Sequence, residues 1–237
     1  MITERIGVIG LGNAGGAVAG ALAKKTKVVG FDPSPERCMN AKGLGVDCVD
    51  SVEELAEKTD HIILSLPKPE ISIAVTKSLC DGASTPTLLI ETSTVTPQTA
   101  VTCDNLCKQK QIAYVDAAIA GGVASMAAGE ITFFLGGAVE NKKLAHGILS
   151  LIAAGIYDLG PVGAGMGTKV VNNGVMHALM VVLIEAFSMS NKLGVSSQTM
   201  IEILNREEGL LRPLVHRVQE RMQEGNYEGG MSVTNAR

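Results

Sequence analysis

Lys169 and Asn173 stand four residues apart at the start of a long apolar stretch. This spacing places two side chains on one face of a helix. The glycine-rich segment 160–167 precedes the pair and Gly194 is suited to end a helix, so we expect one helix over residues 163–193. A lysine beside an amide at the start of a helix is a pair that could bind and react with a substrate. The alternative is a solvated first-turn lysine beside a merely polar asparagine.

The beginning of the chain has the pattern of a dinucleotide-binding unit. A short apolar strand at residues 6–9 leads directly into the segment GLGNAG at 10–15. An alanine-rich helix follows over 14–25, and a second apolar strand over 27–32. The glycines permit a tight turn and let backbone N–H groups approach a pyrophosphate, whose charge the helix N-terminus favours. We therefore expect the site to bind a nicotinamide dinucleotide.

Asp32 ends the second strand, 22 residues after Gly10. A carboxylate there can accept hydrogen bonds from the adenosine ribose and would repel a 2′-phosphate. The next residues, 33–35, are Pro, Ser and Pro, with no arginine to hold such a phosphate. The site is therefore predicted to prefer NAD over NADP. The alternative for Asp32 is a helix N-cap or a turn residue.

The remaining sequence alternates between apolar strands and helices. The further strands are expected at 46–49, 61–66, 87–91, 113–116, 131–135 and 156–159, and helices at 52–58, 70–79 and 97–110. Ser51 with Glu54 forms a capping-box start for the first of these helices. Repeated strand–helix units imply an α/β fold with a parallel, doubly wound sheet, whose ligands gather at the carboxyl ends of the strands. The segments expected to line that crevice are Gly10–Gly15, Leu66-Pro67, Ser93-Thr94 and Ala118–Gly122.

Length and charge limit the architecture and the partners. The 237 residues suit a Rossmann-type domain over 1–161 and an all-helical domain over 162–237. A net charge of −4 without a block of Lys or Arg argues against nucleic-acid and anionic-membrane partners. The apolar segment 175–187 is too short to span a bilayer, so we expect a buried helix that packs against a second subunit in a homodimer or homotetramer.

Cysteine and methionine usage indicates a cytoplasmic protein with an aliphatic core. Five cysteines, an odd number without C-x-x-C spacing, are interpreted as reduced thiols. The N-terminus enters a strand at once, so we expect no signal peptide. The methionines at 176, 180 and 189 are predicted to lie in the core.

Five blocks together resemble one known family. They are IGVIGLGNAG at 6–15, LSLP at 64–67, ETSTVTP at 91–97, DAAIAGGVASMAAGEITFFLGG at 116–137 and GPVGAGMGTKVVNN at 160–173. In this order they resemble the β-hydroxyacid dehydrogenase family, which includes 3-hydroxyisobutyrate dehydrogenase, tartronate semialdehyde reductase and, more distantly, 6-phosphogluconate dehydrogenase. The resemblance implies hydride transfer between NAD and a short 3-hydroxy carboxylic acid, interconverted with its semialdehyde or keto acid.

The resemblance also implies a role for particular residues. Lys169 would be the general acid/base, and Asn173 would help to hold the substrate. The substrate carboxylate would meet the backbone around Ala120, Gly121 and Gly122. The residues implied to hold the cofactor are Gly10, Leu11, Gly12, Asn13, Ala14, Gly15, Asp32, Leu66, Pro67 and Thr94. No metal site is implied.

The chain departs from the family pattern in three ways. Ala118 and Ala120 stand where the family usually has Pro and Ser, so a hydroxyl that could bond to the substrate is missing. Ala14 replaces a common Met. Family members continue past the point where this chain ends at Thr234–Arg237, so we expect a truncated chain.

Two alternatives to the dehydrogenase remain open. One is a non-catalytic dinucleotide-binding or scaffold protein, although relatives that have lost activity replace the lysine. The other is an imine reductase, although that group typically has another residue at the lysine position.

Overall fold

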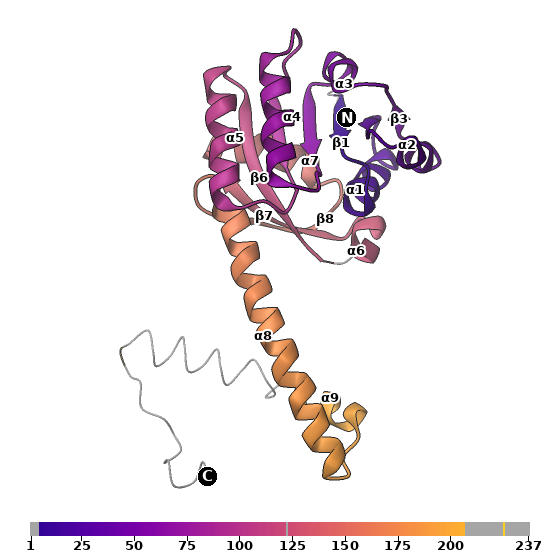
Figure 1. The fold of residues 1–237 in the computed structure, drawn as a ribbon, viewed down its shortest axis with the longest axis vertical. Helices are drawn as coiled ribbons and strands as arrows, with labels where there is room; N and C mark the ends of the chain where they lie inside the picture. Colours follow the sequence, from indigo (N-terminus) through magenta and orange to yellow (C-terminus); the bar gives the residue numbers. More distant parts are fainter. Residues whose placement is uncertain (1–4, 122, 207–224, 226–237) are drawn as a thin grey trace. The chain divides into compact units, whose positions relative to one another are not determined.

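The structure, a computed structural model, describes residues 5–121, 123–206 and 225. Among them, eight strands form one sheet in the order β3-β2-β1-β4-β5-β6-β7-β8 (Figure 1). The strands are β1 Ile6–Ile9, β2 Val28–Phe31, β3 Asp47–Cys48, β4 His61–Leu64, β5 Leu88–Glu91, β6 Ala113–Ala120, β7 Ile131–Gly137 and β8 Ala153–Asp158. The helices are α1 Asn13–Ala23, α2 Pro35–Lys42, α3 Val52–Lys58, α4 Pro69–Asp81, α5 Pro97–Gln109, α6 Val123–Ala128, α7 Val139–Leu149, α8 Ala164–Lys192 and α9 Ser197–Leu204. The predicted α/β fold with a Rossmann-type sheet is confirmed.

Local signals in the sequence explain where several helices begin. The Ser34 hydroxyl accepts from the backbone N–H of Arg37 at the start of α2, and Thr96 accepts in the same way at the start of α5. At α3 the Ser51 hydroxyl accepts from Glu54 N–H, as predicted. In a standard capping box the Glu54 carboxylate would accept from the Ser51 N–H, but here it accepts from the Asp50 N–H.

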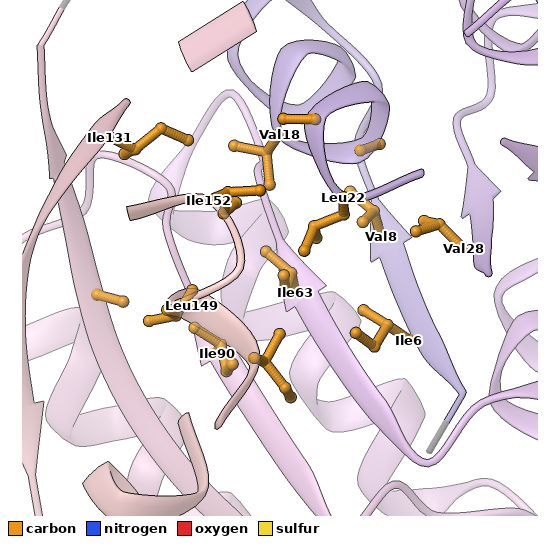
Figure 2. Packing of buried hydrophobic residues seen from close by; sticks show 14 of the residues in the cluster. Ile6, Val8, Val18, Leu22, Val28, Ile63, Ile90, Ile131, Leu149 and Ile152 are labelled. Atoms are coloured by element: carbon orange, nitrogen blue, oxygen red, sulfur yellow. The ribbon is translucent and has the colours of Figure 1, made fainter. Parts of the chain in front are cut away.

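Two apolar layers enclose the sheet. On one face, α1 and α7 pack their side chains onto β1, β4 and β5; Figure 2 shows Val18 and Leu22 of α1 and Leu149 of α7 around Ile63 and Ile90. On the other face, α3, α4 and α5 bury a second cluster of aliphatic side chains and cysteines. Neighbouring residues of β4, β5 and β6 contribute to opposite layers, which is the period of two expected for a sheet covered on both faces.

The sheet is mixed rather than wholly parallel, which corrects the sequence-based prediction. β6 and β7 pair antiparallel, whereas the other neighbours are parallel. The connection between β6 and β7 spans only residues 121–130, and a parallel return needs a crossover of about a dozen residues or more. β6 is also longer than predicted, because its second half pairs with β7. Ala118 therefore lies fully buried inside a strand and not in a crevice-lining loop.

The chain forms two compact units, residues 1–173 and 174–237. The first unit extends past the expected boundary at residue 161 because the first turns of α8 pack into it. Met166 is buried in the core of that unit, and the Gly163 N–H donates to the Asp116 carboxylate. Residues 207–224 and 226–237 of the second unit lie outside the described residues.

Helix α8 exposes most of its apolar side chains in the single chain, so the burial predicted for residues 175–187 depends on the second subunit that the same prediction named. Met176, Met180 and Met189 are 52%, 56% and 61% exposed in the single chain, so their assignment to the core is wrong. The apolar segment 175–187 belongs to the longer helix α8, which as a whole is long and apolar enough to cross a membrane by length and composition. The periodicity of a helix does not show whether its apolar side chains meet the same chain or another surface.

Candidate active site

The glycine loop after β1 packs tightly against the end of β4. Gly10 has a φ of +91°, and a Cβ there would lie 2.2 Å from the Ser65 carbonyl oxygen. A Cβ at Gly15 would lie 1.9 Å from the Gly10 carbonyl oxygen. At Gly12, in contrast, the nearest atom to a Cβ is 3.9 Å away, on the Arg37 side chain. Two of the glycines are therefore needed for close packing, whereas the third faces open space.

A cavity of about 380 Å³ lies over this loop. Gly12 is the N-cap of α1, and no side chain of the described residues caps this helix. The first N–H groups of α1 are thus available to an anion at the positive end of the helix dipole. The glycine cradle and these donors fit the pyrophosphate of a dinucleotide.

Most of the predicted cofactor residues meet at this cavity. Those that line it are Gly10, Gly12, Asn13, Ala14, Gly15, Asp32, Leu66 and Pro67. Leu11 does not line it, because its side chain is buried in the core and its N–H donates to Asp32 at 2.8 Å. Thr94 is outside the lining as well and contacts Lys169 instead.

Asp32 is buried and holds the glycine loop and the following turn together. Its Oδ2 accepts from Leu11 N–H, and its Oδ1 accepts from Ser34 N–H at 2.9 Å. The turn role that was the alternative for Asp32 is therefore present, although Ser34 is the N-cap of α2. A carboxylate oxygen has two lone pairs, so these bonds leave acceptor capacity for a ribose diol.

Arg37 is a residue that the sequence interpretation missed. Residues 33–35 contain no arginine, but the first turn of α2 brings the Arg37 guanidinium to 3.4 Å from Asp32 Oδ2. The Arg37 side chain is 54% exposed and lines the same cavity. The signal that could have found it is the capping serine at position 34, which fixes where the helix starts.

Lys169 lies in the first turns of α8 and points at the end of β5. Its Nζ donates to Thr94 Oγ1 at 2.9 Å. The side chain is half-buried, and burial lowers the pKa of its amine below the ordinary value. The loop with Thr94 is joined to the cofactor cavity, because the neighbouring Ser93 Oγ accepts from the N–H of the cavity-lining Leu66 at 2.6 Å. The lysine, the threonine and the cavity thus form one continuous region.

The residues predicted to bind the substrate are brought together less closely than those predicted to hold the cofactor. Asn173 is exposed on α8, one turn beyond Lys169. Ala120 ends β6, paired with Thr132, and Gly121 follows it with a φ of +128°. In the part of the chain that the structure describes, the side chain of Lys169 forms no hydrogen bond with any of these three residues. Gly122 lies outside the described residues.

Two buried carboxyl groups lie behind the Lys169–Thr94 contact. Glu91 Oε1 accepts from the Ser93 N–H at 2.8 Å. Asp116 accepts from the N–H groups of Gly163 at 2.8 Å and of Met166 at 2.9 Å. Burial raises the pKa of Glu91 to about 7 and also raises the pKa of Asp116. The sequence signal for Glu91 is an acid at the carboxyl end of an apolar run, and for Asp116 an acid inside one.

Two family models match nearly the whole chain. Residues 5–160 match the NAD binding domain of 6-phosphogluconate dehydrogenase, and residues 163–236 match the family described as NAD-binding of NADP-dependent 3-hydroxyisobutyrate dehydrogenase. The chain belongs to the β-hydroxyacid dehydrogenase family. The resemblance seen in the five sequence blocks is therefore confirmed.

Individual relatives agree with this family. The chain is 31% identical over 205 residues to the probable 3-hydroxyisobutyrate dehydrogenase of Mycobacterium tuberculosis, covering 86% of this chain and 70% of that one. The solved structure of M. tuberculosis 3-hydroxyisobutyrate dehydrogenase with L-serine is 30% identical, with a TM-score of 0.80 over 88% of this chain and 72% of that one. An imine reductase from Pseudomonas sp. has a TM-score of 0.83 over 96% of this chain and 80% of its own, but 19% identity, which shows the shared fold alone.

The family assignment gives the reaction class. This β-hydroxyacid dehydrogenase is an NAD(P)-dependent oxidoreductase of hydroxy acids. The imine reductase alternative has weaker support, because its solved representatives match in fold and not in sequence.

Proposed function

We propose that the protein interconverts a short 3-hydroxy carboxylic acid and its semialdehyde or keto acid, with Lys169 as the general acid/base. The single observation that supports this most directly is the 2.9 Å contact between Lys169 Nζ and Thr94 Oγ1. It holds a half-buried amine at the carboxyl end of β5, where ligands of such sheets gather. The alternative of a solvated surface lysine fits less well with this burial.

The proposed chemistry needs a proton acceptor at the substrate hydroxyl. A bound NAD supplies the hydride acceptor: the alcohol loses a hydride and a proton, and gives a carbonyl, NADH and H⁺. In this direction the neutral Lys169 amine takes the hydroxyl proton. In the reverse direction its ammonium form donates the proton and stabilises the forming alkoxide. Burial supports the basic role, because it lowers the amine's pKa.

The test is turnover with a matched pair of lysine variants. NADH production is followed over short 3-hydroxy acids, including 3-hydroxyisobutyrate and L-serine, for the wild type, Lys169→Ala and Lys192→Ala. Lys192 ends the same helix and serves as the control. We expect Lys169→Ala to lower kcat by roughly 10²- to 10⁴-fold with NAD affinity unchanged. Retention of kcat in Lys169→Ala would refute the assignment, and absence of wild-type turnover in either direction would favour the non-catalytic alternative.

The finer choice of cofactor is proposed to be NAD. The buried Asp32 carboxylate supports this, because it would lie against a 2′-phosphate. Arg37 beside it reduces that repulsion, so we expect weaker binding of NADP rather than none. Dissociation constants for both dinucleotides test this, and tighter binding of NADP would overturn it.

The substrate itself is proposed to differ from those of relatives that carry a serine at position 120. Ala120 is half-buried at the last position of β6 and has no hydroxyl to bond to a substrate oxygen. Ala118 is buried within the strand and takes no part in this choice. Ala120→Ser is expected to change the order of preference among the 3-hydroxy acids, and an unchanged order would contradict the proposal.

We also propose that the exposed apolar side chains of α8 pack against a second copy of the chain. Its exposed aliphatic and methionine side chains are Val170, Val171, Val175, Met176, Met180, Val181, Val182, Ile184 and Met189. An exposed apolar surface of this extent is typical of an interaction site. A homodimer or homotetramer in the cytoplasm, without membrane or nucleic-acid partners, is consistent with the net charge of −4 and with five free thiols. Light scattering at micromolar concentration and vesicle flotation separate a self-associating protein from a membrane-bound one.

A further inference from the structure

Glu91 and Asp116 are neighbours across the sheet. β5 and β6 pair in parallel with Glu91 opposite Asp116, and both residues are fully buried. Leu89 and Tyr114, two residues earlier on their strands, belong to the core under α3, α4 and α5. Because side chains alternate along a strand, the two carboxyl groups point to that same face.

The Glu91 carboxyl group organises the turn after β5. Its Oε1 accepts from Ser93 N–H, and the Ser93 hydroxyl in turn accepts from Leu66 N–H. The next residue is Thr94, which contacts Lys169. One buried acid therefore fixes a turn that touches both the cofactor cavity and the lysine.

The Asp116 carboxyl group organises the start of α8. Each of its oxygens accepts one backbone N–H, from Gly163 and from Met166. The space around it is closed, because a Cβ at Gly136 would lie 2.4 Å from Asp116 Oδ1 and a Cβ at Gly165 would lie 2.9 Å from Oδ2. These bonds fix the helical turn that precedes Lys169.

We propose that Glu91 and Asp116 are positioning residues for the proton-transfer pair: Glu91 sets the turn that presents Thr94, and Asp116 sets the helix start that presents Lys169. The inference rests on the proposed role of Lys169. Neither carboxyl group contacts Lys169, and burial is the cause of its lowered pKa. The two acids therefore act through geometry and not through direct charge attraction.

Glu91 and Asp116 differ in whether the matching amide side chain can replace them, because they use their carboxylate oxygens differently. Glu91 uses one oxygen as an acceptor, and Oε2 has no partner of good geometry among the described residues. A glutamine keeps that acceptor, and its amide can donate to the Ser72 hydroxyl that faces the carboxyl group. Asp116 uses both oxygens, so an asparagine would place an N–H donor against a backbone N–H. Glutamine should serve at position 91, and asparagine should fail at position 116.

The experiment compares Glu91→Gln, Glu91→Leu and Asp116→Asn in the full chain. Asp104→Asn is the control, because Asp104 is also a buried acid but pairs with Lys108 on the surface of α5. The readouts are kcat, the KM for NAD, the pH profile of kcat/KM in the oxidation direction, and thermal unfolding. The pH profile separates positioning from general stability, because its acid limb reports the base that must be deprotonated.

For Glu91→Gln we expect kcat within about threefold of the wild type, since the acceptor remains. For Glu91→Leu we expect kcat to fall at least about tenfold and the KM for NAD to rise, because both the Thr94 turn and the Leu66 link lose their support. For Asp116→Asn we expect a similar fall in kcat and an acid limb displaced to higher pH, since a loosened helix start leaves Lys169 more solvated. Its KM for NAD should stay unchanged, because Asp116 does not contact the glycine loop.

The Glu91 variants and the Asp116 variant can each refute the proposal independently. Equal damage from Glu91→Gln and Glu91→Leu, or an unmoved acid limb in a folded Asp116→Asn protein, would reject positioning by these acids. If Asp116→Asn does not fold, the contrast between the two Glu91 variants decides. Failure of the underlying proposed function gives a different result: Lys169→Ala would then keep its turnover and its acid limb.

Discussion

Replacing Gly12 with alanine is expected to weaken cofactor binding while leaving the fold intact. Its backbone angles, φ −66° and ψ −167°, are open to alanine, and the nearest atom to the new methyl group would be 3.9 Å away. The methyl group would enter the cavity beside the free N–H groups of α1, where a pyrophosphate binds. Loss of one charge-assisted hydrogen bond costs about 1.5–3 kcal/mol. The dissociation constant for NAD should therefore rise roughly ten- to a hundredfold.

Replacing Gly15 with alanine is expected instead to destabilise the fold. The new Cβ would lie 1.9 Å from the Gly10 carbonyl oxygen and 2.8 Å from Ser65 Cβ, so the backbone must move. Overpacking of this kind costs about 3 kcal/mol. In a protein of this size that lowers Tm by roughly 6–12 °C.

The assay pairs calorimetric titration of NAD with thermal unfolding followed by circular dichroism. Gly147→Ala is the control, because Gly147 is an exposed residue of α7 and a Cβ there meets nothing within 4 Å. It should leave NAD affinity unchanged and raise stability by up to about 1 kcal/mol. The reasoning fails if Gly12→Ala unfolds as readily as Gly15→Ala and still binds NAD with wild-type affinity.

Four further predictions follow from particular contacts. Arg37→Ala should weaken NADP binding at least about tenfold and NAD binding much less, because one cation near Asp32 is lost; equal effects in titrations with both dinucleotides would contradict this. Glu91→Gln should flatten stability against pH. The folded protein binds the Glu91 proton more tightly than the unfolded chain, so the wild type loses about 3 kcal/mol as pH rises from about 4.5 to about 7, and urea unfolding at both pH values checks this. The acid limb of wild-type kcat/KM should lie below the ordinary lysine pKa, because burial lowers the pKa of Lys169, and it should vanish in Lys169→Ala. Met180→Glu with Ile184→Glu should shift light scattering towards the monomer, and an unchanged mass would exclude this face of α8 as the interface.

Features set by neighbouring residues were predictable from the sequence. The order of strand, glycine loop, helix, strand and acid at residues 6–32 is confirmed, as are the start of α3 at Ser51 and the start of α5 at Pro97. Caps, turns and proline positions depend on atoms only a few residues apart, so a single sequence is enough to recognise them.

The family's catalytic block could also be located, but its surroundings could not. Lys169 was identified as the candidate base, and Thr94 as a cofactor residue. Their mutual contact joins positions 75 residues apart and depends on how α8 starts against β6. The contact between Arg37 and Asp32 is different, because it joins residues only five positions apart and the capping Ser34 is a local signal for the helix turn that carries Arg37.

What the sequence alone determined was the class of fold, the dinucleotide loop, the lysine and the family. Only the tertiary structure decided that β7 runs antiparallel to β6, that Glu91 and Asp116 lie buried side by side, and that the apolar side chains of α8 are exposed in the single chain. The physical reason is that burial and pairing depend on which distant segments pack together. A pattern of apolar residues shows that a surface favours burial, whereas the tertiary structure shows which apolar surfaces are buried within the chain.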